Sequence, residues 1–479
     1  MRVSEYYKLG RTQPGLDFVD VDIDADLPVF TDPRALRLLP SDWGAECVSL
    51  LQNFFETILS AIRSGRELDA KRLLSMLREP NETRLGLSKG RPRGRALGPV
   101  SAVSVWESLR RSDAVKSGLL QDLEDSILMI EGIGDDIISD ITTNVIRAPL
   151  VTYTQEMCAY YGIPLEDDVD SGPLWDPGQH DWHSRYVALP VPANQKLVLV
   201  PKVIVRRRMD YNFDEYFKNY ILEYLREREL SANSELVRTL KDGRRRVLTK
   251  DLVAKYGRGK GVVVRETLQK PELLDGYRGM KLRSFGRPLT QEALADEENA
   301  ARPDWNALLQ DVLRIATGPD ASGDYEKKVE AFLTAIFYPS LTNPQPQARI
   351  HDGRKRIDIT YTNSATRGFF HWVGQHYPAA HVFVECKNYG GEVGNPELDQ
   401  ISGRFSPSRG QVGLLVCRAF EDKERFLKSC RDTANDHRGY VIALDDSDLS
   451  HLAAHRESGG HLYEFDLLKQ SFQALVGFA

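Results

Sequence analysis

The chain has 479 residues, with 63 Lys and Arg against 69 Asp and Glu and 41% hydrophobic side chains. This length predicts about three domains, and the ordinary composition excludes a disordered, collagenous or coiled-coil chain. No apolar stretch approaches the roughly 18 residues that a membrane span needs, and the first residues lack the apolar run of a signal peptide, so we expect a cytoplasmic protein without membrane contact.

Charge is distributed unevenly along the chain. Residues 121–180 contain 13 Asp and Glu and a single Arg, whereas residues 201–290 contain 22 Lys and Arg and 12 Asp and Glu. Such segregation is typical of an electrostatic footprint for nucleic acid, and equally of a solvated face on a large protein. The two alternatives stay open at this point.

Residues 1–185 are predicted to form a helical and mixed domain that regulates the protein or recognises its target. Apolar residues recur at helical spacing over 43–62, which predicts a helix packed into a core. The apolar run 126–133 ends near a glycine and predicts a buried strand. The stretch 86–99, rich in Arg, Gly and Pro, is predicted as a loop that contacts phosphates or is merely solvated.

Metal-binding motifs in this first part are weak. Asp135, Asp136 and Asp140 are close enough to hold a divalent ion, but acidic residues also favour the start of a helix. The sequence His-Asp-Trp-His at 180–183 lacks the spacing of a zinc protease helix, and the neighbouring prolines and glycine predict a loop there. The five cysteines show no C-x-x-C spacing and predict buried thiols instead of disulfides or a zinc ribbon.

Residues 186–290 are predicted to form a basic α/β domain. Strands are expected at 186–189, 197–200 and 262–264, and an aromatic stripe after Phe213 predicts a helix packed in the core. The segment around Lys260 is not a P-loop, because no Ser or Thr follows that lysine. Lys and Arg beside glycines suit sequence-independent phosphate contacts. The predicted nucleic-acid-binding residues are Arg206, Arg207, Arg208, Arg244, Arg245, Arg246, Arg258 and Lys260.

These basic clusters also allow a second interpretation. They would then pair with the acidic segment between Asp122 and Asp176 and hold two domains together in an inactive arrangement. Residues 291–323 are rich in Pro and Gly around one short helix pattern at 305–315, and we interpret them as a linker.

Residues 324–479 are predicted to form a compact α/β domain. A helix is expected at 325–337, a strand hairpin at 347–350 and 356–361, and a further strand at 380–387. Alternation with period two puts Glu385 and Lys387 on one face of the last strand and Cys386 on the opposite, core-facing side.

If these strands are neighbours, Asp358, Glu385 and Lys387 converge. Two carboxylates suit Mg²⁺, which prefers oxygen ligands, and an ammonium group can orient an attacking water or stabilise charge during phosphodiester hydrolysis. Glu326 on the preceding helix would add a third carboxylate. The alternative is structural, with Glu385 and Lys387 as a salt bridge at a strand end and Asp358 as a solvated partner of Arg356.

These residues and the order of the elements resemble the PD-(D/E)XK, or restriction-endonuclease-like, nuclease superfamily, and within it the Mrr-like restriction branch. The resemblance covers about 125 residues, roughly a quarter of the chain. Asp358 matches the motif's Asp, Glu385-Cys386-Lys387 its E-x-K, and Glu326 the acidic residue of the first helix; Ile357 replaces the motif's proline.

The resemblance implies an αβββαβ core with a mixed sheet flanked by helices, preceded by helical and mixed α/β domains. It implies Mg²⁺, with Mn²⁺ as a substitute, held by Asp358 and Glu385, and DNA as substrate in bacterial restriction or anti-phage defence. Supporting roles are expected for three further residues, Glu330, Gln400 and Arg404.

Three questions stay open in the sequence. Nothing in the residues separates DNA from RNA, so a signal-gated RNase effector is one alternative. A catalytically idle nuclease fold that binds DNA within a defence complex is another, although buried like charges without a metal would serve no purpose there. A homo-oligomer or defence-complex subunits are possible assemblies.

Overall fold

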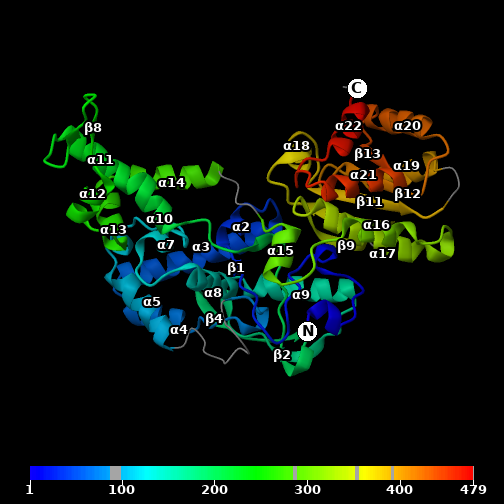
Figure 1. The fold of residues 1–479 in the computed structure, drawn as a ribbon. Coiled ribbons are helices and arrows are strands. Elements are labelled where there is room, and N and C mark those ends of the chain that lie inside the picture. The colour runs from blue at the N-terminus through cyan, green and yellow to red at the C-terminus, as the bar shows by residue number, and fades with distance from the viewer. Residues whose placement is uncertain (87–98, 284–287, 351–354, 390–392, 478–479) are drawn as a thin grey trace.

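The computed structural model describes residues 1–86, 99–283, 288–350, 355–389 and 393–477. The ribbon consists of a helical body that contains the N-terminus, a helical arm beside it, and an α/β unit that ends the chain (Figure 1). Among the described residues, no helix combines the length and the apolar character that a membrane crossing requires. Most of the Arg-rich stretch predicted as a loop, residues 87–98, lies outside the described part of the chain.

The body contains short strands between longer helices. Its elements are α1 (Val3–Tyr6), β1 (Phe30–Thr31), α2 (Pro33–Arg37), α3 (Asp42–Arg63), α4 (Glu67–Ser75), α5 (Pro99–Arg111), α6 (Asp113–Lys116), α7 (Asp125–Met129), α8 (Asp135–Val145), α9 (Arg147–Tyr161), β2 (Glu166–Asp170), β3 (Leu174–Asp176), β4 (Asp181–His183), β5 (Tyr186–Leu189) and β6 (Val205–Arg206). The helix predicted over 43–62 is confirmed as α3. It starts where the Ser41 side chain accepts a hydrogen bond from the Gly44 amide at 3.1 Å, and its apolar stripe is buried.

Three predictions in the body are wrong in type. The apolar run predicted as a strand at 126–133 begins with the helix α7, all of whose residues are buried. A segment that is apolar on every side has no periodicity to distinguish a helix from a strand. The predicted loop at 180–183 contains β4, which pairs with β3. The predicted strand at 197–200 is buried but does not form a regular strand, because its amides and carbonyls form hydrogen bonds with irregular parts of the chain, for example with the Val19 amide.

The arm begins directly after the body. It contains α10 (Phe213–Tyr216), a π-helical turn (Phe217–Ile221), α11 (Leu222–Ser231), β7 (Arg238–Thr239), β8 (Arg245–Arg246), α12 (Thr249–Tyr256), α13 (Lys260–Gln269) and α14 (Glu272–Arg283). The aromatic stripe packs in the core as expected, with the Tyr216 and Tyr277 ring centroids 5.1 Å apart. The strand predicted at 262–264 is wrong: these valines lie in α13, where packing against α7 and α14 outweighs the β preference of branched side chains.

The buried side chains form two cores. The first runs from Val3 to Leu294, also includes Tyr338, and continues through residue 185, where the sequence predicts a domain boundary. The second begins at Trp305, inside the segment interpreted as a linker. The helix predicted there is confirmed as α16 (Trp305–Leu313), while α15 (Gln291–Glu297) precedes it. Because α16 packs on the α/β unit, this part of the linker belongs to that unit's core.

The α/β unit is built on a five-stranded mixed sheet in the order β13-β12-β11-β10-β9. Strands β9, β10 and β11 are antiparallel, and β11, β12 and β13 are parallel. Its elements are α17 (Ser322–Phe337), β9 (Leu341–Ile350), β10 (Lys355–Asn363), α18 (Gly368–His376), β11 (His381–Lys387), α19 (Asn395–Ser402), β12 (Val412–Cys417), α20 (Lys423–Asn435), β13 (Tyr440–Leu444), α21 (Asp446–Glu457) and α22 (Asp466–Leu475).

The α/β and mixed-sheet predictions are therefore confirmed for this unit, including the first helix, the hairpin strands β9 and β10 and the strand β11. Helix α18, between β10 and β11, was not predicted. The unit contacts the body directly: the Asn343 amide donates to Asp17 Oδ1 at 2.9 Å, and the Tyr338 hydroxyl donates to the Lys202 carbonyl at 3.2 Å.

Candidate functional site

The predicted catalytic residues lie on two adjacent antiparallel strands. In the pairing of β10 with β11, Ile359 lies opposite Val384. One residue further, Asp358 lies opposite Glu385, and alternation along β11 puts Lys387 on the same face as Glu385. Directly opposite residues of an antiparallel pair have Cβ atoms about 5 Å apart. The strand pairing itself thus brings the two carboxylates together.

Glu385 is the most buried of these side chains, with 1% of its surface exposed. Its Oε1 accepts hydrogen bonds from Lys387 Nζ at 2.9 Å and from Gln400 Nε2. Lys387 Nζ also donates to Gln400 Oε1 at 3.1 Å, which closes a three-residue network. The second carboxylate oxygen of Glu385, Oε2, is buried and has no hydrogen-bond partner within the described residues. A carboxylate oxygen of this kind is costly unless a cation coordinates it.

The electrostatic surroundings of Glu385 also favour a bound cation. Burial raises the pKa of its carboxyl group, and the neighbouring Asp358 carboxylate raises it further. Lys387 and Arg404 lower this pKa, but they do not cancel the increase. Like charges directly opposite each other destabilise a strand pair. The two carboxylates therefore store repulsion that a bound divalent cation would relieve.

Asp358 is held in place by the backbone of the neighbouring strand. The Asp358 Oδ2 accepts a hydrogen bond from the Cys386 amide at 2.9 Å, and Asp358 is 8% exposed. The Cys386 side chain packs against the core of the α/β unit, as predicted. Burial and then the Asp358 carboxylate raise the pKa of the Cys386 thiol well above its usual value, so the thiol stays protonated.

The two acidic residues of α17 have different surroundings. Glu326 lines a cavity of about 750 Å³ between α17 and the N-terminal body, and its charge also raises the pKa of Cys386. Glu330 is 2% exposed and forms an ion pair with Arg11, while the Thr334 hydroxyl donates to it at 2.7 Å. Glu330, predicted as a supporting residue, is thus occupied by a contact between body and α/β unit.

Sequence reasoning did not find Arg11. This residue is 319 positions from Glu330, and its side chain is only 13% exposed. Its guanidinium lies 5.2 Å from the Tyr161 ring centroid. Neither spacing nor composition connects two such distant positions, so only the tertiary structure reveals the contact.

Gln400 and Arg404 come from α19 and the turn that follows it. Gln400 forms hydrogen bonds with both Glu385 and Lys387. Arg404 is half-buried, its charge lowers the pKa of Glu385, and its Nε has no hydrogen-bond partner within the described residues.

The described residues contain no group of three or more His, Cys, Asp or Glu arranged to hold a metal. Asp358 and Glu385 form a group of two. Mg²⁺ commonly binds through one or two carboxylates and takes its other ligands from water and substrate phosphate, so this pair and the free Glu385 Oε2 fit that ion.

The other acidic motif of the sequence, Asp135, Asp136 and Asp140, lies on α8. Asp135 and Asp136 are in the first turn of this helix. Burial and the Asp136 carboxylate raise the pKa of Asp140 to about 8.

Two of the predicted phosphate-binding residues are engaged inside the protein. Arg206 is 8% exposed and donates to the carbonyls of Val203 and Val205. Lys260 Nζ donates to the Ile130 carbonyl at 2.7 Å, within the acidic segment, and burial lowers its pKa to about 8. Lys260 therefore fits the interpretation in which basic residues hold the arm to the acidic segment.

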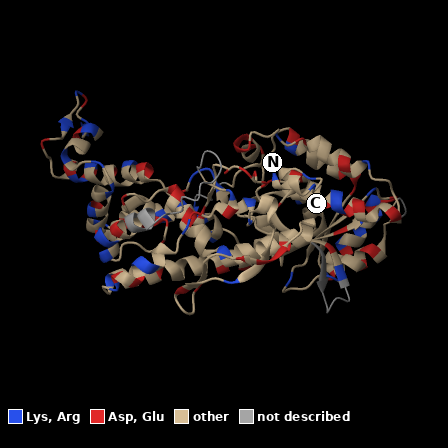
Figure 2. Cartoon of the chain, turned by 90° about the horizontal axis from the view of Figure 1, so that it is seen from below, with Lys and Arg blue, Asp and Glu red and all other residues tan. Residues whose placement is uncertain are grey.

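The other predicted basic residues are exposed. Arg207 pairs with Glu297, Arg258 with Asp214 and Arg244 with Asp242. Arg245 donates to Asn233 and to the Leu230 carbonyl. For Arg208 and Arg246, the described part of the chain provides no side-chain hydrogen bond or ion pair. Lys and Arg occur along the arm and at its hairpin end (Figure 2).

Comparison with known proteins matches residues 8–212 to a family described as Domain of unknown function (DUF8370). No curated protein matches the chain, and no solved structure matches it. The matched residues cover the body from just after α1 and end immediately before α10. Asp358, Glu385 and Lys387 lie outside the match.

Replacing Glu385 with glutamine is expected to stabilise the metal-free protein at neutral pH by about 1 kcal/mol. The glutamine keeps an oxygen for Lys387 and removes the repulsion with Asp358. Because the pKa of Glu385 is raised in the folded state, wild-type stability falls as pH rises above the ordinary carboxyl value of 4.5. The gain should therefore be larger at pH 8 than at pH 5 in thermal melts with EDTA. An equal gain at both pH values would contradict the assigned repulsion.

Proposed function

We propose that the protein is a Mg²⁺-dependent endonuclease that cleaves DNA phosphodiester bonds. The observation that carries this proposal is the buried Asp358–Glu385 pair beside Lys387, with one Glu385 oxygen free of any donor among the described residues. Asp358 and Glu385 would hold the ion. When bound, it would polarise the phosphate and lower the pKa of a water molecule.

The chain's own residues have distinct roles in this proposal. Lys387, held beside Glu385 at 2.9 Å, orients the attacking water or stabilises the charge that develops on the phosphate. Gln400 contacts both Glu385 and Lys387 and fixes their relative position. Glu326 supports the site from α17.

The architecture supports the resemblance to the restriction-endonuclease-like fold. The order α17, β9, β10, β11, α19 and β12 corresponds to αβββαβ, with α18 inserted before β11. The parallel pairing of β11 with β12 gives the mixed sheet that the resemblance implies. A role in bacterial restriction or anti-phage defence, in the cytoplasm, follows from that resemblance alone.

The test compares the purified chain with Asp358→Asn on plasmid DNA, linear DNA and RNA, each with Mg²⁺, Mn²⁺ or EDTA. We expect wild type to nick and linearise plasmid with either cation, and we expect no cleavage with EDTA or by the variant. DNA binding without cleavage under every condition would favour the idle nuclease fold. Cleavage of RNA alone would favour an RNase.

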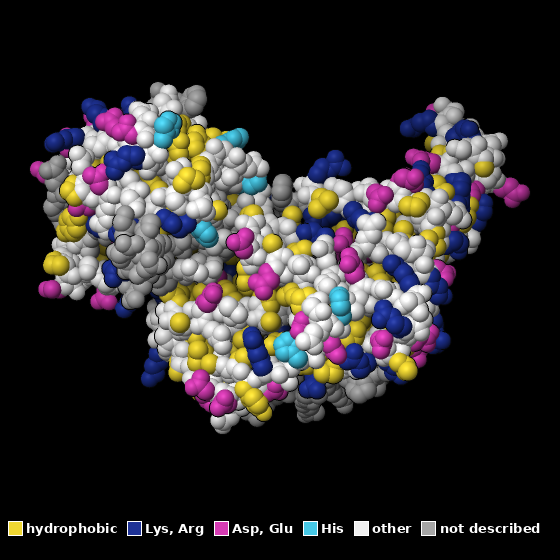
Figure 3. Space-filling view, turned by 180° about the vertical axis from the view of Figure 1, so that it is seen from behind, with side chains coloured by type: hydrophobic (Ala, Val, Ile, Leu, Met, Phe, Trp, Pro, Cys, Tyr) yellow, Lys and Arg dark blue, Asp and Glu magenta, His cyan; other side chains and the backbone are white. Residues whose placement is uncertain are grey.

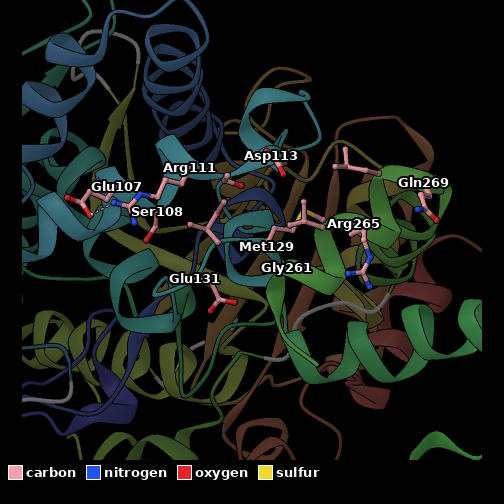
Figure 4. Close-up of a pocket in the computed structure, with 13 residues that line it drawn as sticks. Glu107, Ser108, Arg111, Asp113, Met129, Glu131, Gly261, Arg265 and Gln269 are labelled. Carbon is pink, nitrogen blue, oxygen red and sulfur yellow. Dashed lines mark hydrogen bonds and ion pairs between the residues drawn. The ribbon is translucent and has the colours of Figure 1, made fainter. Parts of the chain in front are cut away.

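A second candidate function, a signal-gated effector, is favoured by a cavity of about 720 Å³ between the body and α13. Figure 4 shows Glu107, Ser108 and Arg111 on one side of it and Arg265 and Gln269 across from them. This volume lies in the range of small-molecule sites. Arg111 and Arg265 line the cavity together with Glu107, Asp113 and Glu131, so nucleosides and nucleotides of different charge are the first probes. A gated effector would show low basal cleavage that rises when the ligand is added.

A further inference from the structure

The arm ends in a short two-stranded ribbon, residues 238–250, that we call the basic hairpin. In it, β7 and β8 pair with Arg238 opposite Arg246 and Thr239 opposite Arg245. The Leu240 amide donates to the Arg244 carbonyl at 2.8 Å and closes the turn, where Gly243 has a φ of +80°. The hairpin contains six Lys and Arg against one Asp.

The charges of the basic hairpin are only partly balanced. Residues 241–246 are all exposed. Arg238 pairs with Asp251 at 2.7 Å. No side-chain hydrogen bond or ion pair is found for Lys241, Arg246 or Lys250 within the described ranges. Because Asp251 balances the charge of Arg238, the charges left for an anionic partner to neutralise are those of Lys241, Arg246 and Lys250.

The base of the hairpin, by contrast, is anchored. Val247 is 4% exposed, and Leu252, in the helix that follows the hairpin, is fully buried in the first of the two cores. Arg226 of α11 donates to the Val247 carbonyl at 3.3 Å, and Arg245 donates to the Leu230 carbonyl at 2.8 Å. The ribbon is therefore held in one orientation, and it stands at the end of the arm, away from the α/β unit (Figure 1).

We infer that the basic hairpin binds B-form duplex DNA and thereby makes duplex DNA, not RNA, the substrate of this chain. The inference rests on the proposed nuclease function. A two-stranded ribbon fits the major groove of B-DNA, whereas the major groove of A-form RNA is too deep and narrow for it. Lys241 and Arg246 neutralise phosphates at the groove edges. The surface is hollowed between the arm and the α/β unit, which leaves space for a duplex (Figure 3).

The test measures binding of a blunt DNA duplex and of an RNA duplex of the same sequence, in EDTA, at several salt concentrations. The protein is the full chain with Asp358→Asn, so cleavage does not interfere. Adding Lys241→Ala and Arg246→Ala should weaken DNA binding. A plot of the logarithm of the DNA-binding constant against the logarithm of the salt concentration should become less steep by about 0.9 per lost phosphate contact. The matched control, Lys71→Ala with Lys469→Ala, removes two exposed charges elsewhere and should leave the slope unchanged.

The results separate this inference from the proposed function. An unchanged slope and affinity in the hairpin variant would overturn the inference, and so would tighter binding of the RNA duplex than of the DNA duplex by the starting protein. Thermal melts verify that the variants fold. Wild type could cleave nothing with Mg²⁺ or Mn²⁺ while the hairpin variant still binds DNA more weakly than the starting protein. In that case the nuclease proposal fails and the DNA contact of the basic hairpin stands.

Discussion

Replacing Lys387 with alanine is expected to reduce DNA cleavage by at least about 100-fold, the usual cost of losing one charged group that stabilises a transition state. Among the described residues, Lys387 is the one cation that hydrogen-bonds within this network, at 2.9 Å from Glu385 and 3.1 Å from Gln400. The measurement is the single-turnover cleavage rate at saturating duplex DNA with Mg²⁺. DNA affinity should change little, because the phosphate contacts proposed for the basic hairpin do not involve Lys387.

A matched control exists within the same chain. Asp69-Ala70-Lys71 repeats the D/E-x-K spacing on α4, where Lys71 is exposed. Lys71→Ala should keep the wild-type rate, which separates the effect of position from that of sequence pattern. Wild-type cleavage by a folded Lys387→Ala protein would eliminate the assignment of the site to β10 and β11.

The second large effect is expected from Arg11→Ala, which should lower the free energy of unfolding by about 3 kcal/mol or more. Glu330 is 2% exposed, and Arg11 is its ion-pair partner. Removing the guanidinium leaves the Glu330 carboxylate, which α17 carries, buried without its counter-charge. Urea unfolding, followed by the far-ultraviolet circular dichroism of the whole chain, measures the loss.

The control for this prediction is an exposed ion pair. Arg110 and Glu67 contact at 2.9 Å with about half of each side chain exposed, and such pairs contribute roughly 0–1 kcal/mol. Arg110→Ala should therefore have a small effect. Adding Glu330→Gln to Arg11→Ala should recover much of the stability, because the buried charge is then gone. A loss below 1 kcal/mol for Arg11→Ala would show that the pair does not hold the body to α17.

The elements and faces of the candidate-site residues were predictable because they depend on local rules, whereas the pairing of β10 with β11 that brings them together is tertiary. The alternation of apolar and polar residues at 356–361 and 380–387 indicated strands, and period two put Glu385 and Lys387 on one face. Glu326 preceded apolar residues at helical spacing, which placed it on the first helix. Those patterns require only neighbours within a few residues.

Other features were decided by tertiary structure alone. Residues 126–129 of the apolar run became part of the helix α7, whose residues are all buried. Lys260 became a partly buried contact to the Ile130 carbonyl because α13 packs against α7. The ion pair of Arg11 with Glu330 joins residues 319 positions apart. A side chain's hydropathy and local spacing determine its secondary structure and face, whereas the partner that satisfies a buried charge depends on which distant segment the fold brings beside it.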